Sequence, residues 1–219
     1  MKFTAKILSI AFVASSLSAE DIVTLPKPDA GGWISLFNGK DLTGWNGDPK
    51  VWRVKDGYIS GETEKLEGGN TFLIFKKPFS NYVLELDCLL VGRKGNSGIQ
   101  YRSKHSERGA NKWVVKGYQA DFANGCWGKL YEEGGRGALV WKYKDKAPEI
   151  KANDEWNRYR ITTKGSKLTQ ELNGTVTIEL DDKNPAKSAK EGVIALQYHS
   201  PGGFEVRFRN IRIKLLGDN

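Results

Sequence analysis

Two alternating runs joined by Asn-Gly decide the fold class of this chain: Lys167-Leu-Thr-Gln-Glu-Leu-Asn-Gly-Thr-Val-Thr-Ile-Glu-Leu180. Leucine alternates with polar residues before Asn173-Gly174, and valine, isoleucine and leucine alternate with polar residues after it. A two-residue hairpin turn needs positive φ at both central positions, and Asn-Gly tolerates this well. The stretch therefore predicts two antiparallel strands joined by a tight turn.

Most of the remaining chain also has the pattern of β-strands. Further strands are predicted at residues 52–55, 58–61, 82–90, 153–163 and 204–216, the last with an irregularity near Asn210 where the alternation breaks. Asp56-Gly57 indicates another tight turn, and a turn of helix is expected around residues 186–190. The polar segments 103–112 and 125–136 are predicted to be long loops. No long segment has the 3.6-residue apolar period of a helix, so we expect an all-β, two-sheet antiparallel β-sandwich.

The chain length and the first residues define the expected domain organisation. A chain of 219 residues suits one β-sandwich domain, which we place at residues 20–219. Residues 1–19 combine a short basic start, an apolar run and small residues before Glu20, which is typical of a secretory signal peptide. We therefore expect a protein exported to the periplasm or the extracellular space, with no membrane span.

Charge and cysteine content disfavour several classes of function. The formal net charge is +8, but basic and acidic residues are interspersed, so nucleic acid is not an expected partner. Cys88 and Cys126 are too few for a closed zinc site. Export would permit a disulfide between them, and the sequence leaves that pairing open.

Three stretches place two polar side chains each on one face of a predicted strand: residues 96–102, 117–122 and 194–199. Because residues i and i+2 of a strand point the same way, three polar pairs are expected. They are Gln100 with Arg102, Gln119 with Asp121, and Gln197 with His199. If the three strands share a sheet, they give it a polar face suited to a polyhydroxylated ligand.

Each polar residue has a structural alternative. His199 could act as a general acid or base, or could only cap the end of its strand. Arg102 could clamp a substrate oxygen, or could form an ion pair with Asp121, which is itself a candidate base. The three glutamines suit sugar hydroxyls, although they would equally satisfy a solvated sheet face. His105, in a charged segment, is expected to be merely solvated.

The adjacent carboxylates Glu132-Glu133 do not form a conventional glycosidase pair. Neighbours in an extended chain point to opposite sides, so only one of them, together with Tyr131, could reach a site. Seven tryptophans favour a carbohydrate ligand, although Trp33, Trp45 and Trp52 are expected in packing. The sequence contains no phosphate-binding glycine loop, His-Glu-x-x-His zinc motif or Gly-x-Ser-x-Gly elbow.

An ordered set of motifs resembles the 3-keto-disaccharide hydrolase domain family. The matching motifs, in chain order, are Phe37–Trp45, Trp52–Gly61, Asn96–Ile99 with Arg102, Gly117–Gln119 with Asp121, Leu130-Tyr131, Glu155–Asn157, Asn173-Gly174, Leu196–His199 and Phe208–Arg212. The resemblance covers nearly all of residues 20–219. It implies a concanavalin-like or LamG-like jelly roll and activity on 3-keto-glycosides or 3-keto-disaccharides.

The activity implied by the resemblance is elimination across carbons 1 and 2 followed by hydration, which is net hydrolysis. It requires a base, a donor for the enolate oxygen and an acid for the leaving group. We assign His199 or Asp121 as base, and Arg102 as the stabiliser of the enolate oxygen. Gln100, Gln119 and Gln197 would hold hydroxyls, and Tyr131 or Glu132 would serve the leaving group. A divalent metal held by His199, Asp121 and a loop carboxylate is conceivable. The alternatives are a non-catalytic carbohydrate-binding module and an adhesion domain of the same fold.

Overall fold

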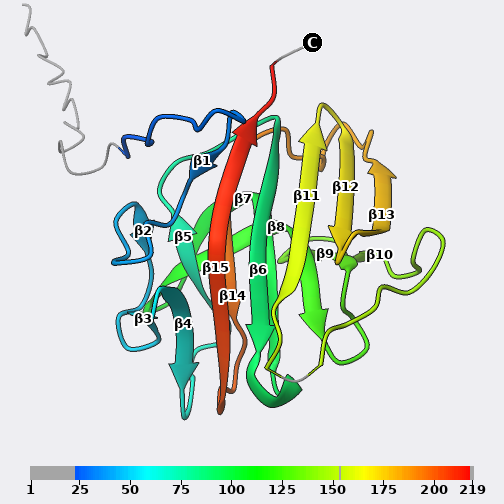
Figure 1. Cartoon of the computed structure of the whole chain (residues 1–219). Coiled ribbons are helices and arrows are strands. Elements are labelled where there is room, and N and C mark those ends of the chain that lie inside the picture. The colour runs from blue at the N-terminus through cyan, green and yellow to red at the C-terminus, as the bar shows by residue number, and fades with distance from the viewer. Residues whose placement is uncertain (1–22, 153, 218–219) are drawn as a thin grey trace, which may run out of the picture.

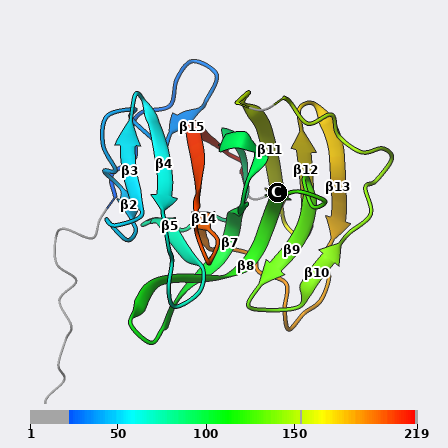
Figure 2. The ribbon, with the colours of Figure 1, turned by 90° about the horizontal axis from the view of Figure 1, so that it is seen from below.

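The computed structural model describes residues 23–152 and 154–217, which form two antiparallel sheets packed face to face (Figures 1 and 2). The first sheet has eight strands in the order β13-β12-β11-β6-β15-β4-β3, with β1 paired to β15. These strands are β1 (Ile34–Ser35), β3 (Trp52–Lys55), β4 (Tyr58–Thr63), β6 (Tyr82–Leu90), β11 (Asn157–Lys164), β12 (Lys167–Leu172), β13 (Thr175–Asp181) and β15 (Phe204–Leu215). This confirms the predicted all-β sandwich.

The second sheet has seven strands in the order β10-β9-β8-β7-β14-β5-β2. They are β2 (Trp45–Asn46), β5 (Thr71–Phe75), β7 (Asn96–Arg108), β8 (Asn111–Ala123), β9 (Lys129–Glu133), β10 (Gly137–Val140) and β14 (Val193–Tyr198). The three polar stretches lie on the adjacent strands β8, β7 and β14 at the centre of this sheet. The 3₁₀ turn η2 (Val91–Arg93) joins β6 to β7.

Turn chemistry explains the strand connections that the sequence predicts. Asn173 and Gly174 both have positive φ, 51° and 79°, and they join β12 to β13 as expected. Asp56 and Gly57 do the same between β3 and β4, with φ of 43° and 78°. The register of β15 against β6 shifts beside Asn210, which has a φ of 53°, so the predicted irregularity is a β-bulge.

The apolar faces of the two sheets form one core between them. Tyr101 and Tyr118 of the seven-stranded sheet stack with their ring centroids 5.6 Å apart and are fully buried. Residues on the opposite faces of the same strands, such as Gln100 and Gln119, consequently lie on the outer face of that sheet. Burial of aromatic and branched side chains is the main stabilising contribution in such a core.

Three local predictions are wrong. Residues 103–112 are not a loop, because β7 and β8 continue through them as a long hairpin whose far end packs against β5. Residues 103–112 are mainly polar because this part of the hairpin extends past the core and is largely exposed to solvent. Residues 129–133, expected in a loop, form β9, and residues 186–190 contain a turn rather than helix.

Several predictions concern residues or properties at the margins of the fold. The predicted signal peptide, residues 1–19, lies outside the described residues, so it stays a prediction. Within the described part of the chain, no helix is both long and apolar enough to cross a membrane. Cys88 and Cys126 are both buried and free, so the disulfide that the sequence left open does not form.

Candidate functional site

The central strands of the seven-stranded sheet carry a polar pocket on their outer face, with a volume of about 480 Å³. Its lining residues are Asn70, Asn96, Gln119, Asp121, Ala123, Asn124, Gly125, Cys126, Tyr131, Glu133, Trp141, Gln197 and His199. Strands β7, β8, β9 and β14 supply the floor, and the segments after β8 and β10 supply the walls. Five of the eight residues that the sequence singled out therefore meet here: Gln119, Asp121, Tyr131, Gln197 and His199.

Asp121 is a buried carboxylate that forms no ion pair with any described residue. The residue is 6% exposed, and Gln119 Nε2 donates a hydrogen bond to its Oδ1 over 3.1 Å. Burial raises the pKa of Asp121 to about 6, and the negative charge of Glu133 adds to the rise. Hydrogen bonds from Cys126 and Gln119 oppose it. Such a carboxylate is ionised at neutral pH but holds a proton readily, as a general base requires.

Glu133 is a second carboxylate of the pocket, contributed by β9. Gln197 Nε2 donates to Glu133 Oε2 over 3.3 Å. Burial raises the pKa of Glu133, while the charges of His199 and Arg108 and hydrogen bonds from Asn70 and Gln197 oppose the rise. The pocket thus contains two carboxylates that are both held towards their protonated forms.

His199 follows directly after β14, at the rim of the same pocket. Its Nδ1 lies 2.5 Å from the carbonyl oxygen of Ser200. Because a carbonyl oxygen only accepts hydrogen bonds, Nδ1 must carry the hydrogen, which leaves Nε2 as the acceptor of the neutral ring. His199 can therefore take a proton from a ligand, and when protonated it can donate one.

A buried chain of hydrogen bonds orients Asp121. Ser103 Oγ donates to Gln100 Oε1 over 2.8 Å, and Gln100 Nε2 donates to Gln119 Oε1 over 2.5 Å. Gln119 Nε2 then donates to Asp121. Gln100 is fully buried beneath the pocket and does not line it, so its expected contact with substrate hydroxyls is replaced by a role in fixing the orientation of Gln119.

Two acceptor oxygens at the pocket have no partner. Gln197 Oε1 and Asn96 Oδ1 are buried, and within the described residues neither receives a hydrogen bond. Gln197 as a whole is only 1% exposed, so leaving its oxygen unpaired is costly. The prediction that Gln197 holds a substrate hydroxyl stays a prediction.

Arg102 does not join this pocket, and the prediction that it projects beside Gln100 is wrong. The β7–β8 register shifts between Tyr101 and Lys104, and Arg102 adopts a φ of 46° at this bulge. Its guanidinium donates to the carbonyl oxygens of Ser80, Gly165 and Ala189 and to Asn81 Oδ1. Arg102 therefore ties loops together at one end of the sandwich, and its ion pair with Asp121, considered from the sequence, does not form.

Glu132 also points away from the pocket. It accepts hydrogen bonds from the guanidinium of Arg136, which in turn bonds Asp182, and Asp182 accepts from the Tyr118 hydroxyl over 2.5 Å. The neighbouring Glu133 takes the place proposed for Glu132, because it lies two residues from Tyr131 and so on the same face of β9. The i, i+2 rule applied to Tyr131 predicts this choice.

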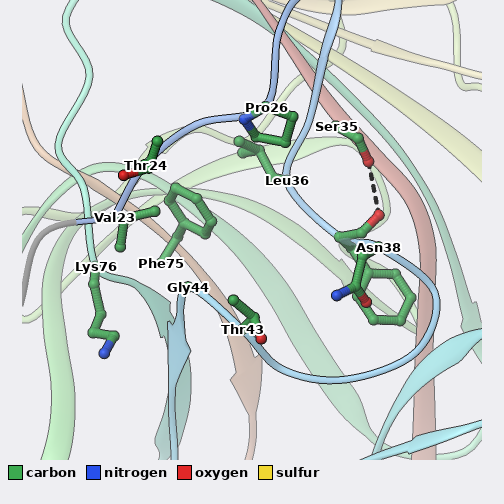
Figure 3. A pocket seen from close by; sticks show the side chains of 11 residues that line it. Val23, Thr24, Pro26, Ser35, Leu36, Asn38, Thr43, Gly44, Phe75 and Lys76 are labelled. Atoms are coloured by element: carbon green, nitrogen blue, oxygen red, sulfur yellow. Dashed lines mark hydrogen bonds between the residues drawn. The ribbon is translucent and has the colours of Figure 1, made fainter. Parts of the chain in front are cut away.

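The remaining candidates fall outside the site. His105 lies exposed on the β7–β8 hairpin, with Nε2 2.7 Å from the Lys112 carbonyl oxygen, as expected for a solvated histidine. A second hollow, of about 400 Å³, lies beside Phe75 and Leu36 (Figure 3). Among the described residues that line it, Lys76 is the only ionisable side chain, so they do not supply the acid and base that sugar chemistry needs. Within residues 23–152 and 154–217, no group of three or more His, Cys, Asp and Glu side chains could hold a metal ion.

The pocket also contains four residues that the sequence does not single out as site residues: Asn70, Asn96, Cys126 and Trp141. Asn96 begins β7 on the same face as Gln100, so the alternation that identified Gln100 also predicts its position. The other three come from segments that are distant in sequence or irregular in structure. No local pattern marks them.

The comparisons with known proteins agree with this architecture. The chain is 28% identical to a 3-keto-disaccharide hydrolase of Bacteroides thetaiotaomicron, in an alignment that covers 93% of this chain and 85% of that protein. A solved structure of a candidate glycosyl hydrolase from Parabacteroides distasonis superposes with a TM-score of 0.65 at 22% identity. That match covers 92% of this chain and 99% of the other.

A carbohydrate-binding module from Bacillus subtilis, CBM66, has the same fold, with a TM-score of 0.55 at 17% identity. It covers 77% of this chain and 94% of the module. At these identities the two solved structures show a shared β-sandwich. The model of the 3-keto-alpha-glucoside-1,2-lyase-like domain matches residues 32–214. The chain therefore belongs to the 3-keto-alpha-glucoside-1,2-lyase-like domain family.

Proposed function

We propose that this carbohydrate-active protein cleaves glycosides whose glycosyl ring carries a ketone at carbon 3. The observation that carries the proposal is Asp121, a carboxylate with a pKa raised to about 6, oriented by Gln119 in a pocket with unpaired hydroxyl acceptors. Family membership and the named activity of the Bacteroides relative support the same substrate class.

A ketone at carbon 3 makes the hydrogen on carbon 2 acidic. A base removes this proton, and the electron pair forms an enolate with its charge on the ketone oxygen. Collapse of the enolate forms the double bond between carbons 1 and 2 and breaks the bond from carbon 1 to the glycosidic oxygen, which takes up a proton. Water then adds across the double bond, so that the net reaction is hydrolysis without a change in oxidation state.

The pocket offers a group for each step. Asp121 is the base, because its pKa of about 6 is close to neutral pH and Gln119 fixes its orientation. Glu133, whose pKa burial raises, is the acid for the leaving oxygen. His199 in its protonated form, with Nδ1–H bonded to the Ser200 carbonyl oxygen, donates from Nε2 to the enolate oxygen, a role that replaces the one first given to Arg102. Gln197 and Asn96 accept hydrogen bonds from the sugar hydroxyls.

A second candidate activity is ordinary glycoside hydrolysis. Asp121 and Glu133 are two carboxylates in one pocket, which resembles the acid and base pair of common glycosidases. This reaction would not need a ketone, so the two activities differ in whether an unoxidised glucoside is cleaved.

The test compares 4-nitrophenyl 3-keto-glucoside with unoxidised 4-nitrophenyl glucoside and follows nitrophenolate release by the purified protein. We expect release from the 3-keto compound alone and retention of the parent glucoside. Release from both at similar rates would favour ordinary hydrolysis. Binding of the 3-keto compound by calorimetry, without any release, would overturn the enzyme proposal in favour of a carbohydrate-binding module.

Export is proposed from residues 1–19 alone. Cell fractionation of the native host, with immunoblotting for the protein, tests this location. A cytoplasmic protein that retains residues 1–19 would contradict it.

A further inference from the structure

An exposed tryptophan stands at the mouth of the polar pocket. Among the described residues, Trp141 and Leu215 are the exposed large hydrophobic side chains, with 44% and 49% of their surface accessible. Leu215 ends β15 on the other sheet, whereas Trp141 lines the pocket. The other walls of the pocket are mainly polar, so Trp141 gives it an apolar surface.

The register of the strands places Trp141 relative to Asp121. Asp121 of β8 lies opposite Lys129 of β9, and Val140 of β10 lies opposite Leu130. Trp141 follows Val140 and so lies next to Lys129. With adjacent strands about 4.8 Å apart, Trp141 is roughly 10 Å from Asp121 across the sheet. This separation leaves room for a second ring beside one held over Asp121.

Lys129 supports the indole ring from one side. Its Nζ lies 4.8 Å from the centroid of the Trp141 ring, within the range of a cation–π contact. Nζ also lies 5.8 Å from the Tyr143 ring. Because Lys129 comes from the regular strand β9, this contact holds an otherwise exposed ring beside the pocket.

We propose that Trp141 binds the leaving group of the substrate by stacking on an uncharged ring with an apolar face, which can be a second sugar or an aromatic aglycone. This inference rests on the proposed function. Asp121 takes its proton from carbon 2, which is bonded to carbon 1, so the glycosidic oxygen lies close to Asp121. We place the leaving group on the side of Asp121 where Trp141 lies, because Trp141 is the exposed aromatic ring among the described residues that line the pocket.

The test measures kcat and KM for 3-keto-glucosides with methyl, phenyl and glucosyl leaving groups. In Trp141→Ala we expect KM to rise about tenfold for the phenyl and glucosyl compounds, with kcat within about twofold and the methyl compound unchanged. Trp141→Phe should recover most of the loss. Leu215→Ala is the matched control, since it removes an equally exposed apolar side chain far from the pocket.

A rise in the KM of Trp141→Ala for the phenyl compound alone identifies an aromatic aglycone. A rise in KM for the glucosyl compound alone identifies a second sugar, and both results support the proposal. An equal rise for the methyl compound, or no rise for any compound, overturns it. Cleavage of the methyl compound by the unaltered protein tests the proposed function separately. If no compound is cleaved, calorimetric binding of phenyl and methyl glucoside still decides the role of Trp141: weaker binding of the phenyl compound alone supports it, and unchanged binding overturns it.

Discussion

The outer faces of the two sheets each bury a carboxylate to nearly the same extent, but the two carboxylates have different partners. Asp87 of β6 is 5% exposed and Asp121 of β8 is 6% exposed. Asp87 accepts hydrogen bonds from Arg158 over 2.8 Å and from Asn210 over 2.7 Å, and Arg209 lies 3.5 Å away. Asp121 forms no ion pair within the described residues and is bonded by neutral donors.

This difference separates a structural carboxylate from a chemically active one. A buried charge that is paired with cations stays ionised and links strands together. A buried carboxylate without a counterion lowers the stability of the folded protein and has a raised pKa. Such raised pKa values are expected at active sites. The comparison therefore predicts opposite behaviour for equivalent substitutions at the two positions.

The largest effect is expected for Asp121→Asn on catalysis. Asparagine keeps the shape of the side chain but cannot accept the proton, so kcat for a 3-keto-glucoside should fall by about 100-fold or more. In the unaltered protein, kcat/KM should decrease about tenfold per pH unit below about pH 6, because Asp121 becomes protonated there. Turnover within threefold of the original would remove Asp121 from the mechanism and leave His199 as the base.

The next effect is a gain in stability in the same variant. The pKa of Asp121 is raised in the folded protein to about 6, so the folded state binds the proton more tightly than the unfolded state. Asp121 therefore lowers stability as pH rises between about 4 and 6. Removing the charge should raise the free energy of unfolding by about 3 kcal/mol at pH 7 and by little at pH 4. Urea unfolding at both pH values measures this, and an equal change at both would contradict a charge effect.

Asp87→Asn should show the reverse pattern. It leaves Arg158 and Arg209 without their carboxylate, although solvent screens these partly exposed arginines. We expect the free energy of unfolding at pH 7 to fall by about 1–2 kcal/mol and kcat to stay within twofold. A large loss of activity in a folded Asp87→Asn protein would mean that the two sheet faces are functionally coupled, against the comparison.

The sequence predicts well where local rules apply and poorly where distant segments meet. Alternation and turn chemistry give the sandwich, the Asn173-Gly174 hairpin and the polar face with Asp121. Alternation fails at Arg102, because a bulge changes which face the following residues occupy and no glycine or proline marks it. Asn70 and Trp141 reach the pocket from segments whose positions are set by tertiary packing alone.

The smallest effect tests whether the hydrogen-bond chain beneath Asp121 matters. In Gln100→Leu, Gln119 loses the donor that fixes its amide orientation, so its bond to Asp121 weakens. Since that bond lowers the pKa of Asp121, the acidic limb of the kcat/KM profile should move to higher pH, with kcat at pH 8 reduced by about threefold. Gln170→Leu is the control, because Gln170 is an equally buried glutamine that bonds Tyr101 within the core. Even if Gln170→Leu is destabilised, the acidic limb of its kcat/KM profile should stay at the same pH as in the unaltered protein. A similar shift in both variants would show that general loosening of the sheet, rather than the chain from Ser103 to Asp121, sets the proton affinity of Asp121.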